Sequence, residues 1–231
     1  MSKSHFGIGN YSPAEAAKLV GIPSASLRRW LFGYRYDHHG PQKDQPPLWR
    51  PEYGIDQEDP VLGFRDLIEA RMVARLRRLG IGMPTIRACL ATAAEIAKDD
   101  HPFSSANFRT DGKGLFLETV GEFESRQVID LRIKQHAFAR IVERSFIDLE
   151  FDEKKATHWY LLENRKSIVA DPTRSFGQPL TTDYGVPTSA IAKSFNAEGS
   201  VEKVARLFDM TLSSVRDALR FETQLKAPLA A

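Results

Sequence analysis

The chain contains a single cysteine, Cys89, among its 231 residues, which excludes internal disulfides and thiolate clusters for zinc. Cys89 lies among apolar neighbours in a helical pattern, so we expect a core thiol. No run approaches the roughly 20 apolar residues of a membrane-spanning helix. A secretory signal requires an apolar run after its charged start, and no such run follows Met1–His5. We therefore expect a cytoplasmic protein with no membrane partner.

The sequence also lacks the patterns of enzyme active sites. It has no Ser-His-Asp order, no thiol nucleophile and no glycine loop that would cradle a phosphate. His38 and His39 are expected to be loop residues, because no cysteine and no close third ligand accompanies them. Asp148, Glu150 and Asp152 share one face of a predicted strand, where we expect an exposed polar surface; a metal site is the alternative. We expect no catalytic residue, no metal and no cofactor.

The small net charge of +2 is unevenly distributed along the chain. Residues 1–50 carry seven Lys and Arg side chains against three Asp and Glu, a net charge of +4, which leaves −2 for the remainder. A basic N-terminal third is the electrostatic footprint of a surface that faces phosphates. A later basic run, Arg71, Arg75, Arg77 and Arg78, is expected to be a solvated face, part of which can reach phosphate.

The clearest local signal is a helix start at Ser12. Ser12 can cap the helix, Pro13 suits its first position, and Glu15 completes a capping box. Gly21 can adopt the left-handed conformation that ends a helix, and Ser24 can cap a second helix after a two-residue turn. Two helices joined by so short a turn predict a helix-turn-helix.

The second helix carries side chains of the types that face a DNA groove. Leu27 and either Trp30 or Leu31 turn inward at helical spacing. This leaves Arg28 and Arg29 outward. Arginine can hold guanine with two hydrogen bonds, while hydroxyls and helix N-terminal amides can hold phosphate oxygens. The alternative is that both arginines only solvate an exposed helix face.

Residues 32–54 lack helical period and interleave aromatic with basic side chains around Pro46-Pro47. This pattern indicates a β wing that touches the DNA backbone or the minor groove. The DNA-binding residues that we predict across the helix pair and the wing are Ser12, Ser24, Ser26, Arg28, Arg29, Tyr34, Arg35 and Arg50.

A family pattern runs through roughly residues 10–98. It consists of Tyr11–Ala17, Leu19, Gly21, Ser24, Leu27–Trp30 and Phe64–Leu67. These residues resemble the DNA-binding domain of MerR-type regulators, which implies a winged helix-turn-helix followed by a further helix pair. Apolar residues at helical spacing up to Gly80 and again after Pro84 support that pair. The long dimerising coiled coil usual in those regulators is missing, because the helical period stops near Asp99.

The middle of the chain, residues 100–160, reads as mixed structure. Asp111–Gly114 lies between apolar runs and signals a hairpin, and Gln135–Phe146 has the spacing of an amphipathic helix. Ile147–Phe151 alternates as a strand, and Thr157–Leu161 can return beside it.

A second helix pair follows near the C-terminus, at Ser200–Phe208 and Ser213–Glu222. Thr211 can cap its second helix, and the small Ala205 before the turn repeats the spacing of the first pair. A second DNA-reading element is therefore one interpretation of this region.

Short turn motifs precede this pair: Asp171-Pro172, Phe176–Pro179 and Gly185–Thr188. Over about residues 165–223, the motifs and the helices resemble the C-terminal domain of VapB-type bacterial antitoxins, long catalogued as a domain of unknown function. Long members also carry a MerR-like N-terminal domain. The resemblance implies a PIN-like ribonuclease toxin as partner, which the antitoxin binds and inhibits, and binding to the operator of their shared promoter.

The implied toxin suggests where it would bind. PIN-type active sites are carboxylate clusters that hold a divalent metal, so an inserted arginine or lysine can neutralise them. We predict Arg216, Arg220 and Lys226 for this role, with Phe221 and Leu225 as apolar anchors. The alternative for Phe221 is a place in the core.

The sequence thus predicts a mainly helical α+β protein with small β elements. Residues 1–98 form a winged helix-turn-helix with a helix pair, 99–163 a mixed α/β connecting region, and 164–231 an antitoxin-type helix-turn-helix-like domain. We expect an antitoxin that inhibits a PIN-like ribonuclease and represses its operon by binding double-stranded operator DNA, as a homodimer that reads two half-sites. The alternative is a MerR-like transcriptional regulator with a ligand-sensing C-terminal region.

Overall fold

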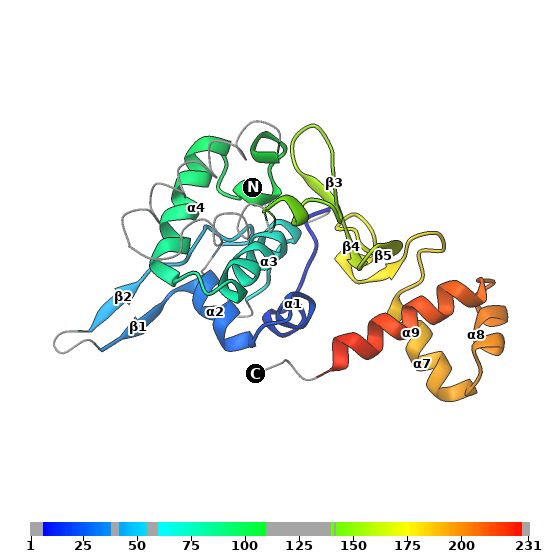
Figure 1. Cartoon of the computed structure of the whole chain (residues 1–231). Helices are drawn as coiled ribbons and strands as arrows, with labels where there is room; N and C mark the ends of the chain where they lie inside the picture. The colour runs from blue at the N-terminus through cyan, green and yellow to red at the C-terminus, as the bar shows by residue number, and fades with distance from the viewer. Residues whose placement is uncertain (1–6, 38–41, 55–59, 110–139, 141, 228–231) are drawn as a thin grey trace, which may run out of the picture.

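The computed structural model describes residues 7–37, 42–54, 60–109, 140 and 142–227, and it has the predicted α+β class (Figure 1). The N-terminal elements are α1 (Pro13–Val20), α2 (Ser24–Phe32), β1 (Tyr34–Tyr36), β2 (Lys43–Gln45), α3 (Phe64–Arg78) and α4 (Met83–Ala97). The later elements are the 3-10 turn η1 (Pro102–Ser104), β3 (Leu149–Phe151), β4 (Ala156–Leu162), β5 (Arg165–Ala170), the 3-10 turn η3 (Ser175–Gly177), β6 (Leu180–Thr181), α7 (Thr188–Glu198), α8 (Val201–Leu207) and α9 (Leu212–Lys226).

Helix α3 is the centre of the N-terminal domain. Most of its residues are buried, including the polar Asp66, Glu69 and Arg71. The apolar cluster around α3 begins at Tyr11 and continues through α4 into the middle of the chain as far as Ala170. Cys89 is 1% exposed in this cluster, so the predicted core thiol is confirmed. No helix among the described residues is both long and apolar enough to cross a bilayer.

A four-stranded antiparallel sheet follows in the order β3-β4-β5-β6. Leu149 pairs with Trp159, Trp159 with Ala170, and Val169 with Leu180. The strand predicted at Ile147–Phe151 is confirmed for Leu149–Phe151, while Ile147 and Asp148 lie in a turn, and its predicted return partner Thr157–Leu161 is confirmed within β4. The expected hairpin at 111–114, His38 and His39 lie outside the described residues, as do 135–139 and 141 of the expected helix at 135–146. The described residues 140 and 142–144 of that helix are helical, and 145–146 lie in a turn.

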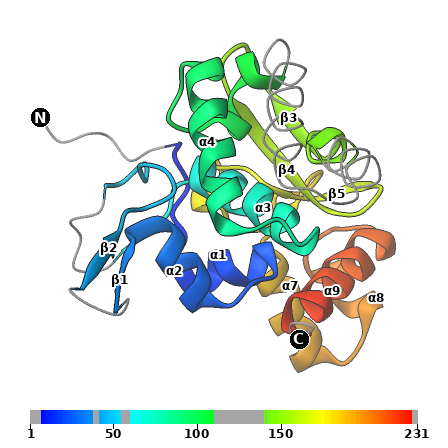
Figure 2. The same ribbon diagram turned by 60° about the vertical axis from the view of Figure 1, so that its left-hand side comes forward.

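The three C-terminal helices pack around a second apolar cluster that includes Ile191, Val204, Val215 and Phe221. Leu19 of α1 packs against this cluster, and α9 contacts α1. Figures 1 and 2 show the red helix α9 running from α8 toward the blue helix α1. The C-terminal helices therefore rest directly on the first helix pair.

Candidate nucleic-acid interface

Helix α1 begins with the predicted capping box. The Ser12 backbone N–H donates to Glu15 Oε2 at 2.9 Å, and the Glu15 backbone N–H donates to Ser12 Oγ at 3.3 Å. Gly21 closes the helix in the left-handed conformation, with φ of 72°. The next amide, of Ile22, still donates to the carbonyl of Ala17 at 3.0 Å, so the turn before α2 has a fixed geometry.

The start of α2 corrects one prediction. Pro23 is the N-cap, in extended conformation, and no side chain caps the helix. Ser24 is the first helical residue instead of the cap, so the helix begins one residue earlier than predicted, because Pro23 with ψ of 135° already occupies the extended N-cap position. The Ser24 hydroxyl is therefore not engaged in capping.

The two faces of α2 divide as predicted. Leu27 and Leu31 are fully buried and Trp30 is 8% exposed, so both inward alternatives are occupied. Arg28 and Arg29 are exposed, while Ser24 and Ser26 are half-buried. No ion pair joins either arginine to another described residue. Both guanidinium groups are therefore presented to solvent on the same helix.

The wing extends this surface. Tyr34 pairs with Gln45, and Tyr36 with Lys43, so these four side chains share one face of the β1–β2 ribbon. The two tyrosine rings lie 5.8 Å apart and remain partly exposed. The guanidinium of Arg29 lies 5.7 Å from the centre of the Tyr34 ring. The exposed face of α2 thus continues onto the tyrosine face of the wing.

Arg35 projects from the opposite face of the ribbon. Its Nε donates to Asp44 Oδ1 at 2.9 Å, with both side chains largely exposed. Its cationic charge is therefore partly countered, unlike those on α2. The sequence did not single out Lys43, because six residues separate the two strands and the pairing of Tyr36 with Lys43 is seen only in the structure.

The root of the wing is held by backbone contacts. Gly33 has φ of +72°, and a Cβ atom there would lie 2.4 Å from the carbonyl oxygen of Gln45, so only glycine fits. On the other side, the Arg87 guanidinium of α4 donates to the carbonyls of Pro46 and Pro47, both at 2.9 Å. These contacts set the angle between the wing and α2.

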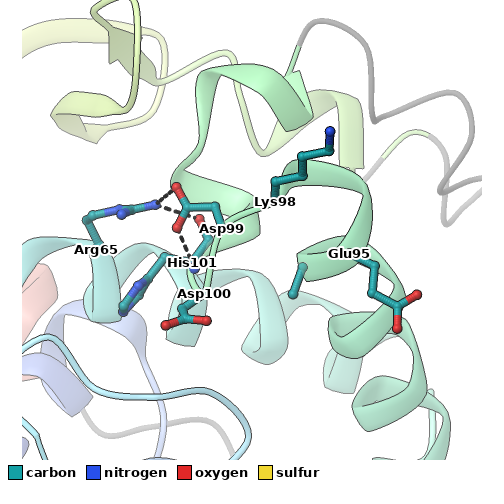
Figure 3. Close-up of a pocket in the computed structure, with 7 residues that line it drawn as sticks. Arg65, Glu95, Lys98, Asp99, Asp100 and His101 are labelled. Atoms are coloured by element: carbon teal, nitrogen blue, oxygen red, sulfur yellow. Dashed lines mark hydrogen bonds and ion pairs between the residues drawn. The ribbon is translucent and has the colours of Figure 1, made fainter.

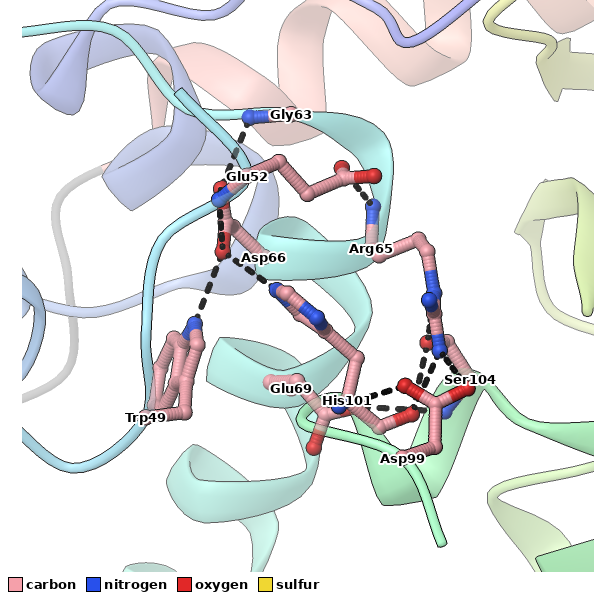
Figure 4. A network of polar contacts seen from close by, with 9 residues as sticks. All are labelled: Trp49, Glu52, Gly63, Arg65, Asp66, Glu69, Asp99, His101 and Ser104. Carbon is pink, nitrogen blue, oxygen red and sulfur yellow. Dashed lines mark hydrogen bonds and ion pairs between the residues drawn. The ribbon is translucent and has the colours of Figure 1, made fainter. Parts of the chain in front are cut away.

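A buried carboxylate anchors the segment that returns from the wing (Figure 4). Asp66 Oδ1 accepts from Trp49 Nε1 at 2.8 Å and is joined to His101 Nε2 at 2.9 Å. Asp66 Oδ2 accepts from the backbone amides of Glu52, at 3.1 Å, and Gly63, at 2.9 Å. Burial lowers the pKa of His101, but its hydrogen bond to Asp66 and the nearby carboxylates outweigh this and raise it. The wing is thereby tied to α3 and to the chain after α4.

The same network continues along α3. Arg65 donates from Nε to Ser104 Oγ at 2.8 Å and pairs with Asp99 at 2.7 Å. Glu69 Oε1 accepts from the Ser104 amide at 3.0 Å, whereas its Oε2 is buried with no hydrogen-bond partner among the described residues. Burial raises the pKa of Glu69 to about 8, so this carboxyl holds a proton at neutral pH.

Two hollows flank this network. One of about 580 Å³ is lined by Arg65, Lys98 and the acidic residues of the α4 end (Figure 3). The other, of about 360 Å³, is lined by Arg50, Glu52 and Tyr53 among others. Asp100 and His101 border both. Arg50 thus lines a hollow beside α3, apart from the tyrosine face of the wing.

The expected solvated face of α3 holds for Arg77 and Arg78, which are exposed, but is wrong for Arg71 and Arg75. Arg71 is 4% exposed; it donates to the Ser145 carbonyl at 2.8 Å and pairs with Asp148. Arg75 reaches the same two partners. Arg78 donates to the carbonyl of Val20 at 2.9 Å and so closes α1. A buried ion pair 77 positions apart in sequence has no local signal.

The three carboxylates near β3 have separate partners. Asp148 binds the α3 arginines, Glu150 accepts from Tyr160 and Lys166 at 2.8 Å each, and Asp152 accepts from two backbone amides. Among the described residues, no three His, Cys, Asp or Glu side chains are grouped closely enough to hold a metal ion. The expected exposed strand face is wrong for Asp148, which lies in the turn before β3 and pairs with the buried Arg71, whereas Asp152 is exposed.

The residues predicted to meet a toxin lie along α9. Arg216, Arg220 and Lys226 are exposed, and Leu225 is half-buried against the second apolar cluster. Phe221 is 6% exposed inside that cluster. The alternative of a core position for Phe221 therefore holds, and its ring is not presented to a partner.

An exposed helix-turn-helix with a wing is the architecture of a DNA-binding protein, and the comparisons agree. The family model "Putative DNA-binding HTH domain" matches residues 10–90. The chain is also 27% identical over 225 residues to a Mycobacterium tuberculosis (strain ATCC 25618 / H37Rv) protein named "Putative antitoxin VapB45", covering 93% of this chain and 94% of that protein. The chain therefore has an N-terminal helix-turn-helix domain and is similar, over nearly its whole length, to a protein named a putative antitoxin.

Two further matches cover the chain equally well. "Uncharacterized protein Rv2308" of the same organism is 24% identical over 229 residues, or 91% of this chain and 89% of that protein. The crystal structure of Rv2018 from Mycobacterium tuberculosis has a TM-score of 0.67 at 23% identity, covering 93% of this chain and 99% of that one. This structural match shows that the fold is shared.

Proposed function

We propose that the chain is a DNA-binding antitoxin that inhibits a ribonuclease toxin and represses its own operon. The observation that carries the DNA-binding half is the continuous surface from Arg28 and Arg29 to the wing tyrosines, joined by the Arg29–Tyr34 contact. Its cations lack acidic partners among the described residues, which leaves them available for phosphates and base edges.

In this proposal α2 enters the major groove. Arg28 and Arg29 reach base edges, and the half-buried Ser24 and Ser26 reach phosphate with their hydroxyls. Ser12, which is also half-buried, lies at the start of α1, where its side chain can approach the DNA backbone. Tyr34, Tyr36 and Lys43 follow the adjacent backbone or minor groove. A homodimer would place two such surfaces on half-sites about one helical turn apart.

The toxin-binding half rests on the similarity to a protein named an antitoxin. We place the toxin at the C-terminal end of α9, where Arg220 and Lys226 are exposed beside the half-buried Leu225. A PIN-like nuclease holds its metal with carboxylates, so cations at this end complement its active site. Phe221 supports the surface from within.

The experiment is coexpression of the chain with its neighbouring gene. The proposal predicts a stable complex, relief of growth arrest, and blocked RNA cleavage by the purified pair. The double variant Arg220→Glu, Lys226→Glu should release the toxin. A matched control is Lys193→Glu on α7, which is exposed but lies outside this end of α9. Equal inhibition of the toxin by the wild type, the double variant and the control would contradict the placement of the toxin at the C-terminal end of α9.

A second candidate function, a ligand-sensing regulator, is favoured by the two hollows beside Asp100 and His101. They adjoin the network that anchors the wing, so a small molecule there would act directly on the DNA-binding surface. Mass spectrometry of the chain purified under native conditions tests this function. A stoichiometric metabolite that changes DNA affinity supports it, and its absence together with toxin capture supports the antitoxin.

A further inference from the structure

The α8–α9 pair repeats the α1–α2 pair at a constant offset of 188 positions. Ser12 caps α1 by accepting from the amide three residues later, and Ser200, 188 positions on, caps α8 in the same way. The offset continues through both turns and into both second helices. The sequence similarity is low, so the correspondence is one of geometry.

The two turns have the same backbone conformation and the same hydrogen bond back to the first helix. Gly21 and Asp209 both have left-handed backbone, with φ of 72° and 50°. The residue after each is buried, and its amide donates back into the first helix: Ile22 to the Ala17 carbonyl at 3.0 Å, and Met210 to the equivalent Ala205 carbonyl at 2.8 Å. Both alanines are buried where the helices approach each other.

The second helices also correspond. Leu27 and Val215 are both fully buried, and Trp30 and Ala218 are both core residues. Arg28 of α2 therefore has Arg216 as its counterpart on α9, and both side chains are exposed. One position differs: the counterpart of Arg29 is Asp217, which is buried and paired with Arg165 at 2.8 Å.

The exposed face of α9 is suited to DNA. Ser213, Arg216, Arg220 and Thr223 follow one another at helical spacing and are all exposed. Neither arginine forms an ion pair with another described residue. Leu212 at the start of the helix is 39% exposed, and such an apolar side chain can contact a thymine methyl group.

We propose that α8–α9 is a second DNA-reading helix-turn-helix, in which Arg216 takes the place that Arg28 has in the first. This inference rests on the proposed DNA binding and extends it: each chain contacts the operator twice. Helix α9 contacts α1, and the Tyr11 hydroxyl donates a hydrogen bond to the Gly177 carbonyl. These contacts hold the two helix-turn-helix pairs in a fixed orientation relative to each other. The distance between the two protected DNA segments is therefore constant.

The test uses the full chain and DNA selected by it from a random duplex library. Hydroxyl-radical footprinting should show two protected segments, which we name the inner segment, protected by α1–α2, and the outer segment, protected by α8–α9. Arg216→Ala should remove the outer segment and weaken binding about 5- to 150-fold, and Arg216→Lys should lose sequence preference there while keeping part of the affinity. Lys193→Ala on α7 removes the same charge from an exposed site and should leave both segments intact.

Arg28→Ala separates the inference from the proposed function. Loss of the inner segment with Arg28→Ala, together with an unchanged footprint for Arg216→Ala, would overturn the inference and leave the proposed function standing. Selection of no DNA by the wild-type chain would overturn both. Loss of toxin capture without any change in the footprint on Arg216→Ala would assign α9 to the protein partner instead. Arg216 is exposed and forms no ion pair with the described residues, so we expect its variants to fold. Thermal unfolding of each variant checks this.

Discussion

The hydroxyl of Tyr11 donates a hydrogen bond of 2.8 Å to the carbonyl oxygen of Gly177, 166 positions later in the chain. The amide of Asn10 donates to the neighbouring carbonyl of Phe176 at 2.9 Å. Both bonds fall immediately before the capped start of α1. The turn motif of the C-terminal region therefore positions the first helix of the DNA-binding pair.

Gly177→Ala should be strongly destabilising. Gly177 has φ of +84°, and a Cβ atom would lie 2.2 Å from the Tyr11 hydroxyl. Gly199→Ala is the matched control, because Gly199 also has positive φ but nothing within 4 Å. The control should lose about 1 kcal/mol of unfolding free energy in urea, and Gly177→Ala clearly more. Equal losses would mean that the Tyr11 contact does not constrain α1.

Asp44→Asn should tighten DNA binding. The substitution removes a negative charge from the wing and releases Arg35 from its exposed ion pair at 2.9 Å. Because such pairs are screened by salt, the gain should be a few-fold at low salt and vanish at high salt. Fluorescence anisotropy at two salt concentrations measures it. Unchanged affinity at low salt would place the wing away from DNA.

Asp148→Ala should cost about 3 kcal/mol of unfolding free energy, because it leaves the buried Arg71 without its anionic partner. Asp152→Ala is the control, because Asp152 is exposed and its side chain accepts hydrogen bonds from the amides of Lys154 and Lys155. It should lose about 1 kcal/mol or less. Denaturant titration of both variants decides, and comparable losses would show that Arg71 does not depend on the pair.

Stability should fall as the pH rises, because of Glu69. Its pKa is near 8 in the folded chain against 4.5 for the free side chain, so the folded state binds the proton more tightly. The stabilisation is complete below about pH 4.5 and is lost by about pH 8. The raised pKa of His101 acts in the same direction.

Glu69→Gln removes the titrating carboxyl while keeping an acceptor for the Ser104 amide. Between about pH 5.5 and pH 8.5 the wild type should lose on the order of 3 kcal/mol more than this variant. Glu95→Gln on the exposed face of α4 should follow the wild type. A pH dependence of Glu69→Gln identical to that of the wild type would show that Glu69 is ionised when folded.

Local signals account for what the sequence predicted well. The capping box at Ser12, the left-handed Gly21 and the two faces of α2 depend on neighbours within a few positions. The prediction of Ser24 as the cap was wrong because Pro23 is itself the extended residue before the helix. The fold class followed from these periodicities.

Long-range polar contacts were beyond local reasoning. Asp66 joins residues from Trp49 to His101, and Arg71 is buried only because Asp148 meets it 77 positions later. No residue spacing in the sequence predicts contacts between such distant side chains. The 188-position correspondence was visible in sequence only as a similar turn, because the equivalence of Arg28 and Arg216 requires the observed caps, turns and buried positions.

The most direct test of the central claim is equilibrium binding of the full chain to DNA from upstream of its own gene. Fluorescence anisotropy should show specific binding by the wild type, with Arg28→Ala weaker by about 1 to 3 kcal/mol and less selective against unrelated DNA. Arg50→Ala should weaken the binding of all DNA to a similar extent, because a phosphate contact carries no sequence preference. Equal affinity and equal selectivity for wild type and Arg28→Ala would contradict the assignment of α2 as the groove-reading helix.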